Sequence, residues 1–243
     1  MKRQQSPDPE GEKRGPVEQP DAHYRNHRDR VRRRFLDGDP ERFQDYELLE
    51  LLLFYSVDRV DVKPLAKQLL ADFKSYGAVL AAPPERLAGY PRISERTIAH
   101  FKAVRESARR MLYGEVSERP LVSSWPQLLD YCRAAMADEP VERFRILFLD
   151  RKNRIIADEV QQKGTVDHTP VYPREVLKRA LELGASGLIL VHNHPSGDPT
   201  PSRGDIDMTR EIREAADKLD IALFDHIVVG RREACSFKAN GLL

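Results

Sequence analysis

The feature that most constrains the fold of this chain is an apolar run that stops at two histidines. Leu188–Val191 are four apolar residues in a row, and His192 and His194 come directly after them. Such a run predicts a β-strand that is buried on both faces. Side chains two residues apart on a strand point to the same side. The two imidazoles are therefore expected to face one point at the end of a buried strand.

A tight loop and the start of a helix are expected after the second histidine. Pro195 lacks a backbone donor and ends regular strand pairing. The following residues are rich in Pro, Gly, Ser and Asp, which is typical of a loop. Ser202 then predicts a helix N-cap, with Asp205 at the third helical position in the spacing of a capping box.

His192, His194 and Asp205 together predict a metal site. Two neutral imidazoles and one carboxylate suit zinc, and three protein ligands leave the fourth position open for water, as in catalytic sites. The alternative is an exposed histidine pair beside an ordinary capped helix. The complete string of strand, loop and cap favours the metal site. Asp198 and Asp207 are the alternative carboxylates.

This string resembles a known metal motif. His192-x-His194, followed after seven residues by Ser202-x-x-Asp205, is similar to the zinc motif of the MPN/JAMM metalloprotease-like domains. The longer string His-Asn-His-Pro-Ser-Gly-Asp-Pro-x-Pro-Ser-x-x-Asp resembles the RadC family (UPF0758 type) within that group. The similarity extends from about Val122 to the C-terminus. RadC-like proteins have historically been associated with DNA repair.

The resemblance implies a fold and two further site residues. The fold is a mixed α/β sheet flanked by helices (MPN/JAMM, cytidine-deaminase-like), preceded by a small α-helical domain. A glutamate at or just before the start of one strand is the general base in such domains, and Glu142 has that position here. Ser202 would donate a hydrogen bond to the oxyanion that forms when water attacks a carbonyl. Glu159 and Glu175 are the other candidate bases.

The pattern of residues after Glu142 agrees with such a sheet, because apolar side chains recur at every second position and a polar turn follows. The expected elements are a strand over 144–148, a second strand over 155–160, a helix over 173–183, a helix over 206–219, a strand over 221–229 and a short closing strand within 236–243.

Five other polar residues of this half resemble no complete motif. His168 is expected to be an exposed loop histidine. Arg174 and Glu175 resemble a Pro-Arg-Glu element of the RadC family and would support the site or the fold. Asp225-His226 also resembles the RadC pattern. His226 is interpreted as a satisfied polar residue of the sheet, and orientation of a metal ligand is the alternative.

The first half of the chain is predicted to be helical. Residues 1–20 are polar and rich in Pro, and they are expected to form a disordered tail. Residues 21–113 are expected to form a small helical domain, 114–120 a linker, and 121–243 the zinc domain. Ser94 predicts the N-cap of a long helix whose inward apolar stripe would comprise Ile98, Phe101, Val104, Ala108 and Met111.

Two features of this half concern nucleic acid. Residues 28–34 are rich in arginine and could contact DNA, or they could be the solvated face of a helix that buries Val31 and Phe35. RadC-like proteins often carry a helix-hairpin-helix with a Gly-x-Gly turn, but residues 89–93 are Gly-Tyr-Pro-Arg-Ile. Pro91 has no N–H to offer to a phosphate. The hairpin is therefore expected to be degenerate.

The composition of the chain argues against several classes of protein. Its 40 basic and 39 acidic residues create no overall field for nucleic acid or membranes. Cys132 and Cys235 form no disulfide framework, which fits a reducing cytosol. No segment reads as a signal peptide or approaches the ~20 apolar residues of a membrane span. A cytoplasmic protein is expected.

The predicted function is zinc-dependent hydrolysis of an amide bond in a peptide or protein, a metallopeptidase-type activity. The alternative is a DNA repair or recombination accessory protein whose metal domain is a binding or regulatory module. Nuclease chemistry at the same site ranks lowest, because nucleases more often use oxygen-rich sites or paired metals.

Overall fold

The computed structural model describes residues 21–38, 40–58, 60–163 and 171–243. These residues belong to two compact units, residues 1–66 and residues 67–243, and each unit is described here by itself. The predicted tail 1–20 and His168 lie outside the described residues. The domain boundaries expected from the sequence stay predictions.

The first unit is helical. It contains α1 (Asp21–Asp37), a 3-10 turn η1 (Pro40–Arg42) and α2 (Asp45–Leu53), and α3 (Lys63–Phe73) spans the boundary to the second unit. Gln44 begins α2 through a capping box with Glu47. The apolar residues of α2 supply the core of this unit, including Leu49 and Leu53, which are fully buried.

The arginine-rich segment 28–34 lies on α1, and part of it holds this unit together. Arg28 is half-buried and donates hydrogen bonds of 3.1–3.3 Å to the carbonyl oxygens that follow or end α2, those of Phe54, Val57 and Val60. Arg34 pairs with Glu47. Of the two residues that the second interpretation buries, Val31 is buried and Phe35 is half-buried.

The second unit begins with helices and a long connecting helix. Its helical elements are α4 (Tyr76–Ala81), α5 (Pro84–Ala88), α6 (Glu95–Ser117), the 3-10 turn η2 (Leu121–Ser123) and α7 (Trp125–Met136). Ser94 caps α6 by accepting a hydrogen bond from the Thr97 amide, as predicted. Since α6 continues to Ser117, it covers the first four residues of the predicted linker 114–120.

The predicted inward stripe of α6 is wrong in its second half. Ala108 is exposed and Met111 is 73% exposed. The stripe that packs includes two arginines: Arg105 bonds to the Ala135 carbonyl, and Arg109 bonds to the hydroxyl of Tyr131. Apolar periodicity could not reveal a stripe whose middle is polar. At its end the stripe is apolar again, with Leu112, Tyr113 and Val116 against the core.

The sheet has five strands in the order β2-β1-β3-β4-β5. They are β1 (Arg143–Leu149), β2 (Ile155–Lys163), β3 (Gly187–Asn193), β4 (Ala222–Val229) and β5 (Ala234–Ser236). Only β3 and β4 pair in parallel, so the mixed sheet expected from the sequence is confirmed. The closing strand is earlier than predicted: it ends at Ser236, and residues 237–241 form turns, with Phe237 buried.

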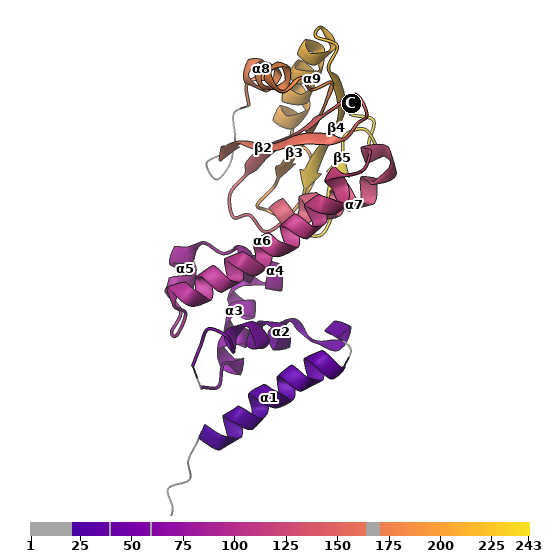
Figure 1. Ribbon diagram of the computed structural model, residues 1–243. Helices are drawn as coiled ribbons and strands as arrows, with labels where there is room; N and C mark the ends of the chain where they lie inside the picture. Colours follow the sequence, from indigo (N-terminus) through magenta and orange to yellow (C-terminus); the bar gives the residue numbers. More distant parts are fainter. Residues whose placement is uncertain (1–20, 39, 59, 164–170) are drawn as a thin grey trace, which may run out of the picture. The chain divides into compact units, whose positions relative to one another are not determined.

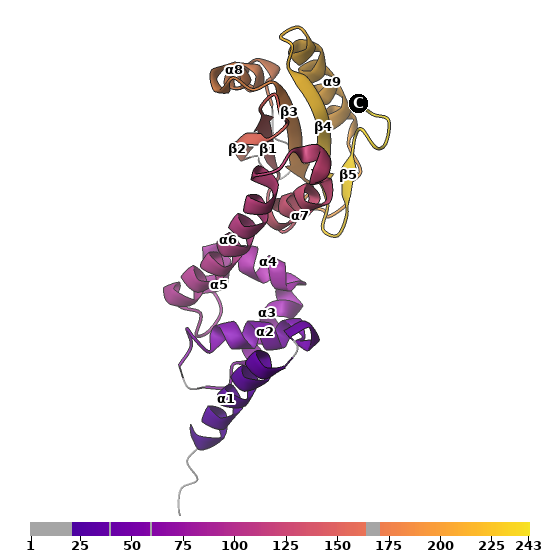
Figure 2. The ribbon, with the colours of Figure 1, turned by 45° about the vertical axis from the view of Figure 1, so that its right-hand side comes forward.

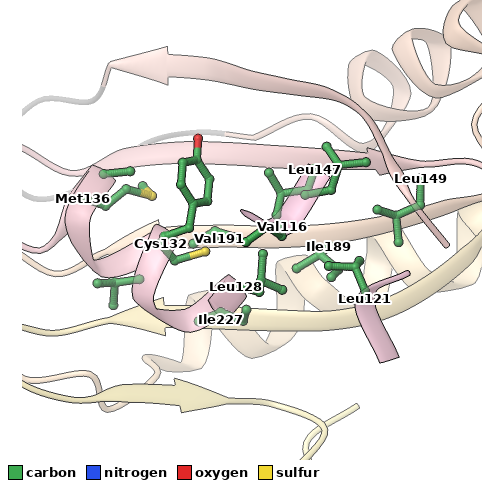
Figure 3. Packing of buried hydrophobic residues seen from close by; sticks show 14 residues of the cluster. Val116, Leu121, Leu128, Cys132, Met136, Leu147, Leu149, Ile189, Val191 and Ile227 are labelled. Carbon is green, nitrogen blue, oxygen red and sulfur yellow. The ribbon is translucent and has the colours of Figure 1, made fainter. Parts of the chain in front are cut away.

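Helices cover both faces of this sheet (Figures 1 and 2). On one face lie α8 (Pro173–Leu183) and α9 (Arg203–Asp217), with Phe144, Leu188 and Leu190 beneath them. On the other face α7 and the end of α6 pack on Leu147, Val191 and their neighbours, as Figure 3 shows. Every residue of β3 is buried, in agreement with the prediction from its apolar run. Among the described helices, none is long and apolar enough to cross a membrane.

Candidate metal centre

The end of β3 brings two imidazoles together. His192 is completely buried, and His194 follows the strand. Their Nε2 atoms are 3.0 Å apart. The strand end is fixed on both sides, because the Arg143 amide donates to Asn193 Oδ1 over 2.9 Å and the His194 amide donates to the Val229 carbonyl over 3.0 Å. The prediction that both rings face one point is confirmed by this contact.

The loop after β3 sets the orientation of His194. Its Nδ1 lies 2.8 Å from the carbonyl oxygen of Asp198. A carbonyl can only accept, so Nδ1 carries the proton and Nε2 of the neutral ring keeps its lone pair. Gly197 allows the turn with a φ of 90°, a region that favours glycine. The sequence of this loop thus aims the Nε2 lone pair of His194 at His192.

The start of α9 supplies the carboxylate. Ser202 and Asp205 form the predicted capping box: the Ser202 amide and hydroxyl each donate to Asp205 Oδ2 over 2.7 Å, and the Asp205 amide donates to Ser202 Oγ over 3.2 Å. Asp205 Oδ1 lies 3.3 Å from His192 Nε2, and Oδ2 lies 3.6 Å from His194 Nε2. The cap therefore holds the carboxylate against both rings.

Two imidazole nitrogens and one carboxylate oxygen thus form a compact donor set. One such atom from each of His192, His194 and Asp205 lies within 4.8 Å of the other two, a group that could hold a metal ion. His192 is buried, while His194 and Asp205 are partly exposed, so the group opens to solvent on one side. This donor set fits zinc, which binds imidazole and carboxylate together in catalytic sites.

The electrostatics of the group also suit a cation. Burial raises the pKa of the Asp205 carboxyl, but the rings of His192 and His194 beside it lower that pKa more, to well below its usual range. The Asp205 carboxylate raises the pKa of His194, because it can accept a hydrogen bond from the protonated ring. The group therefore attracts positive charge, whether a proton or a metal ion.

The candidate base Glu142 lies at the same end of the sheet. It directly precedes β1, and Phe144, two residues later, is paired with His192 in the register of β1 and β3. The Glu142 carboxylate also helps to raise the pKa of His194, although the Asp205 carboxylate has the larger effect. The structure thus brings the charge of Glu142 close enough to act on His194.

The other candidate carboxylates are engaged elsewhere. Glu159 is bound by the guanidinium of Arg179, with contacts of 2.6–3.1 Å, and Glu175 pairs with Arg174. The Asp198 carboxylate accepts from the amide and hydroxyl of Thr200. Asp207 faces Arg203 and Arg210 on α9. In the described part of the chain, the three-residue group formed by His192, His194 and Asp205 includes none of them.

His226 lies closer to the site than its interpretation as an ordinary sheet residue suggested. Its Nε2 is 2.8 Å from His192 Nδ1, and its Nδ1 is 2.6 Å from the hydroxyl of Thr209. Thr209 was missed altogether, although it lies one helical turn after Asp205 and so on the same face of α9. The neighbouring Asp225 carboxylate accepts instead from Ser236 and from two backbone amides.

The chain is similar to known proteins over most of its length. The family model of the RadC-like JAB domain matches residues 122–242. A UPF0758 protein of Rhodobacter capsulatus is 59% identical over 213 residues, which cover 88% of this chain and all of that relative. The UPF0758 protein SPO0054 of Ruegeria pomeroyi is 54% identical over 222 residues, covering 91% of this chain and 99% of the relative.

Proposed function

The chain belongs to the RadC family of UPF0758 proteins, and on this premise we propose that it is a zinc-dependent hydrolase that cleaves amide bonds. The observation that carries the proposal is the group of His192, His194 and Asp205, three donors of the types that zinc prefers, opening to solvent on one side. When bound, zinc supplies a water of lowered pKa and a positive charge beside the substrate carbonyl.

Glu142 would move the proton in this reaction. As a general base it would accept the proton of the attacking water, and as a general acid it would return it to the leaving amine. Two features support this assignment. Glu142 stands at the start of β1, whose Phe144 is paired with His192, and its charge acts on His194. Glu159 and Glu175 are less suited because arginines hold their carboxylates.

Ser202 would stabilise the oxyanion. Its hydroxyl donates to Asp205 Oδ2, so that hydrogen bond must be exchanged when the oxyanion forms. The exchange would leave Asp205 in place, because the Ser202 amide also donates to the same oxygen over 2.7 Å. One residue can thus hold the carboxylate with its backbone and serve the substrate with its side chain.

Metal analysis of the purified protein tests the proposal. We expect one zinc per chain in the wild type and almost none in His194→Ala. His100→Ala, which makes the same change at a half-buried histidine of α6 outside the group, should keep its zinc. Wild-type protein that stays free of zinc after equilibration with it, or equal zinc in His194→Ala, would refute the proposal.

We also propose, as a second candidate function, that residues 28–34 contact DNA in a repair or recombination role. Arg30 and Arg33 favour it, since they are exposed and form no ion pair with a described residue. Binding of duplex DNA should then weaken as salt rises and be lost in the double variant Arg30→Ala, Arg33→Ala. Binding that is equally strong in this variant would exclude α1 as the contact.

A further inference from the structure

A continuous row of hydrogen bonds lies behind the candidate metal centre. It starts at His192 Nδ1, passes through both ring nitrogens of His226 and the hydroxyl of Thr209, and ends at the backbone carbonyl oxygen of Asp205. The row thus connects the side chain of one candidate ligand to the backbone of another. His192, His226 and Thr209 are at most 1% exposed, so solvent does not compete for these bonds.

The carbonyl at the end of the row fixes the direction of every bond in it. The Asp205 carbonyl can only accept, so the single hydroxyl proton of Thr209 is donated there. The Thr209 oxygen must then accept from His226 Nδ1, which lies 2.6 Å away and therefore carries a proton.

The protonation state of His226 also determines which nitrogen of the His192 ring donates. The ring of His226 is completely buried between the rings of Phe144 and Phe237, at centroid distances of 5.8 Å and 4.5 Å. A charged imidazolium would be costly in such surroundings, so the ring is neutral. A neutral imidazole has one donor and one acceptor. With its proton on Nδ1, His226 accepts at Nε2 from the Nδ1–H of His192, 2.8 Å away.

We propose that Thr209 and His226 are positioning residues that fix the tautomer of His192, so that its Nε2 lone pair faces the metal. This inference rests on the proposed metal site. His194 is held in the same tautomer by one hydrogen bond, which its Nδ1–H donates to the Asp198 carbonyl.

The distance between the two rings supports the assignment. With both Nδ1 atoms acting as donors, two Nε2 lone pairs face each other across 3.0 Å, beside a carboxylate. Such an arrangement is repulsive unless a cation lies between the nitrogens, and it leaves the ligand atoms ready for one. Partners behind a ligating histidine commonly fix its tautomer and its orientation in this way.

The test uses Thr209→Val, which removes the hydroxyl and keeps the shape of the side chain. The first readout is the ¹⁵N chemical shifts of the His192 ring in metal-free protein at alkaline pH. The second is the affinity for zinc in competition with a chelator. Thr209→Ser keeps the hydroxyl. Thr97→Val is the matched control, since it makes the same change at another buried threonine, at the start of α6.

We expect wild-type His192 to carry its proton on Nδ1 alone, and Thr209→Val to show both tautomers. Zinc affinity should fall by about tenfold in Thr209→Val, the lower end of the usual effect of such partners. Thr209→Ser and Thr97→Val should resemble the wild type.

A proton on Nε2 of wild-type His192, unchanged ring shifts in Thr209→Val, or an equal loss of affinity in Thr97→Val would overturn the inference. The ring shifts decide it even in a wild type that binds no zinc. A wild type that binds no zinc would refute the proposed metal site, but its ring shifts would still show which nitrogen of His192 carries the proton.

Discussion

Asp205 meets two structural demands with one carboxylate. Its Oδ2 accepts hydrogen bonds from the amide and the hydroxyl of Ser202, the first of which belongs to the capping box, and its two oxygens approach His192 and His194. The position of this residue could be predicted because the spacing from Ser202 that caps a helix is also the spacing of the metal motif. At the residue scale, the same few atoms start α9 and complete the donor set.

Glu142 carries the most direct prediction at this scale. In Glu142→Gln the amide cannot accept the proton of water, so we expect hydrolysis of a peptide substrate to fall by about 10²–10⁴-fold. The zinc content should stay at the wild-type level, since the residue is not part of the donor set. Product peptides released from a peptide mixture can be measured by mass spectrometry, with zinc determined on the same samples.

Glu175→Gln is the control for that experiment, because Glu175 is an exposed glutamate at the start of α8 that pairs with Arg174. It should keep full activity. An active Glu142→Gln would remove Glu142 from the mechanism, and an inactive Glu175→Gln would transfer the role of the base to that residue.

At the scale of elements, local patterns predicted most of what positions the site. The apolar run before His192 became β3, Ser202 capped α9, and the helix predicted over 173–183 is α8. Each of these signals lies within a few residues of the feature it specifies. Contacts between distant elements were not accessible in this way.

His226 and Thr209 illustrate what could not be predicted. They lie on β4 and α9, and their contact depends on the pairing of β4 with β3 and on the rotation of α9 above the sheet. No spacing in the sequence encodes that meeting. The prediction of the inward stripe of α6 failed for a related reason, since Arg105 and Arg109 bond to partners on α7 or just after it.

A second prediction concerns Arg28, which lies on α1 and is expected to stabilise α2. Since its guanidinium bonds to three carbonyl oxygens at and after the end of α2, Arg28→Ala should reduce the opening free energy of α2 amides by about 1.5–3 kcal/mol. Native-state hydrogen exchange measures this quantity.

Arg30→Ala is the matched variant on the same helix, where the side chain is exposed, and it should leave the exchange of α2 unchanged. Equal protection of α2 in Arg28→Ala and wild type would show that these bonds do not stabilise the helix.

At the scale of the whole molecule, zinc binding should appear as added stability. A metal that binds only the folded state at 100 times its dissociation constant stabilises it by about 2.7 kcal/mol. Because the pKa of His194 is raised in the metal-free protein, protons compete with zinc from a higher pH than for an ordinary histidine. The stabilisation should therefore be largest at alkaline pH and decline as the pH falls through this raised pKa.

Thermal unfolding with zinc and with a chelator, over a series of pH values, measures the effect. The difference between the two curves should shrink toward acid pH and be absent at every pH in His194→Ala. A zinc-induced shift that grows toward acid pH would contradict the proposed ligands.

The three candidate ligands all lie between positions 192 and 205, whereas the row of hydrogen bonds behind them requires His226, which is 34 residues after His192. Closing such a short segment loses little chain entropy, so the ligands can gather as soon as β3 and the start of α9 exist. The proton on His192 gains its fixed place only when β4 has joined the sheet. During folding, the three side chains would thus gather before the tautomer of His192 is fixed. Pairing of β4 with β3 would then fix that tautomer and complete the site.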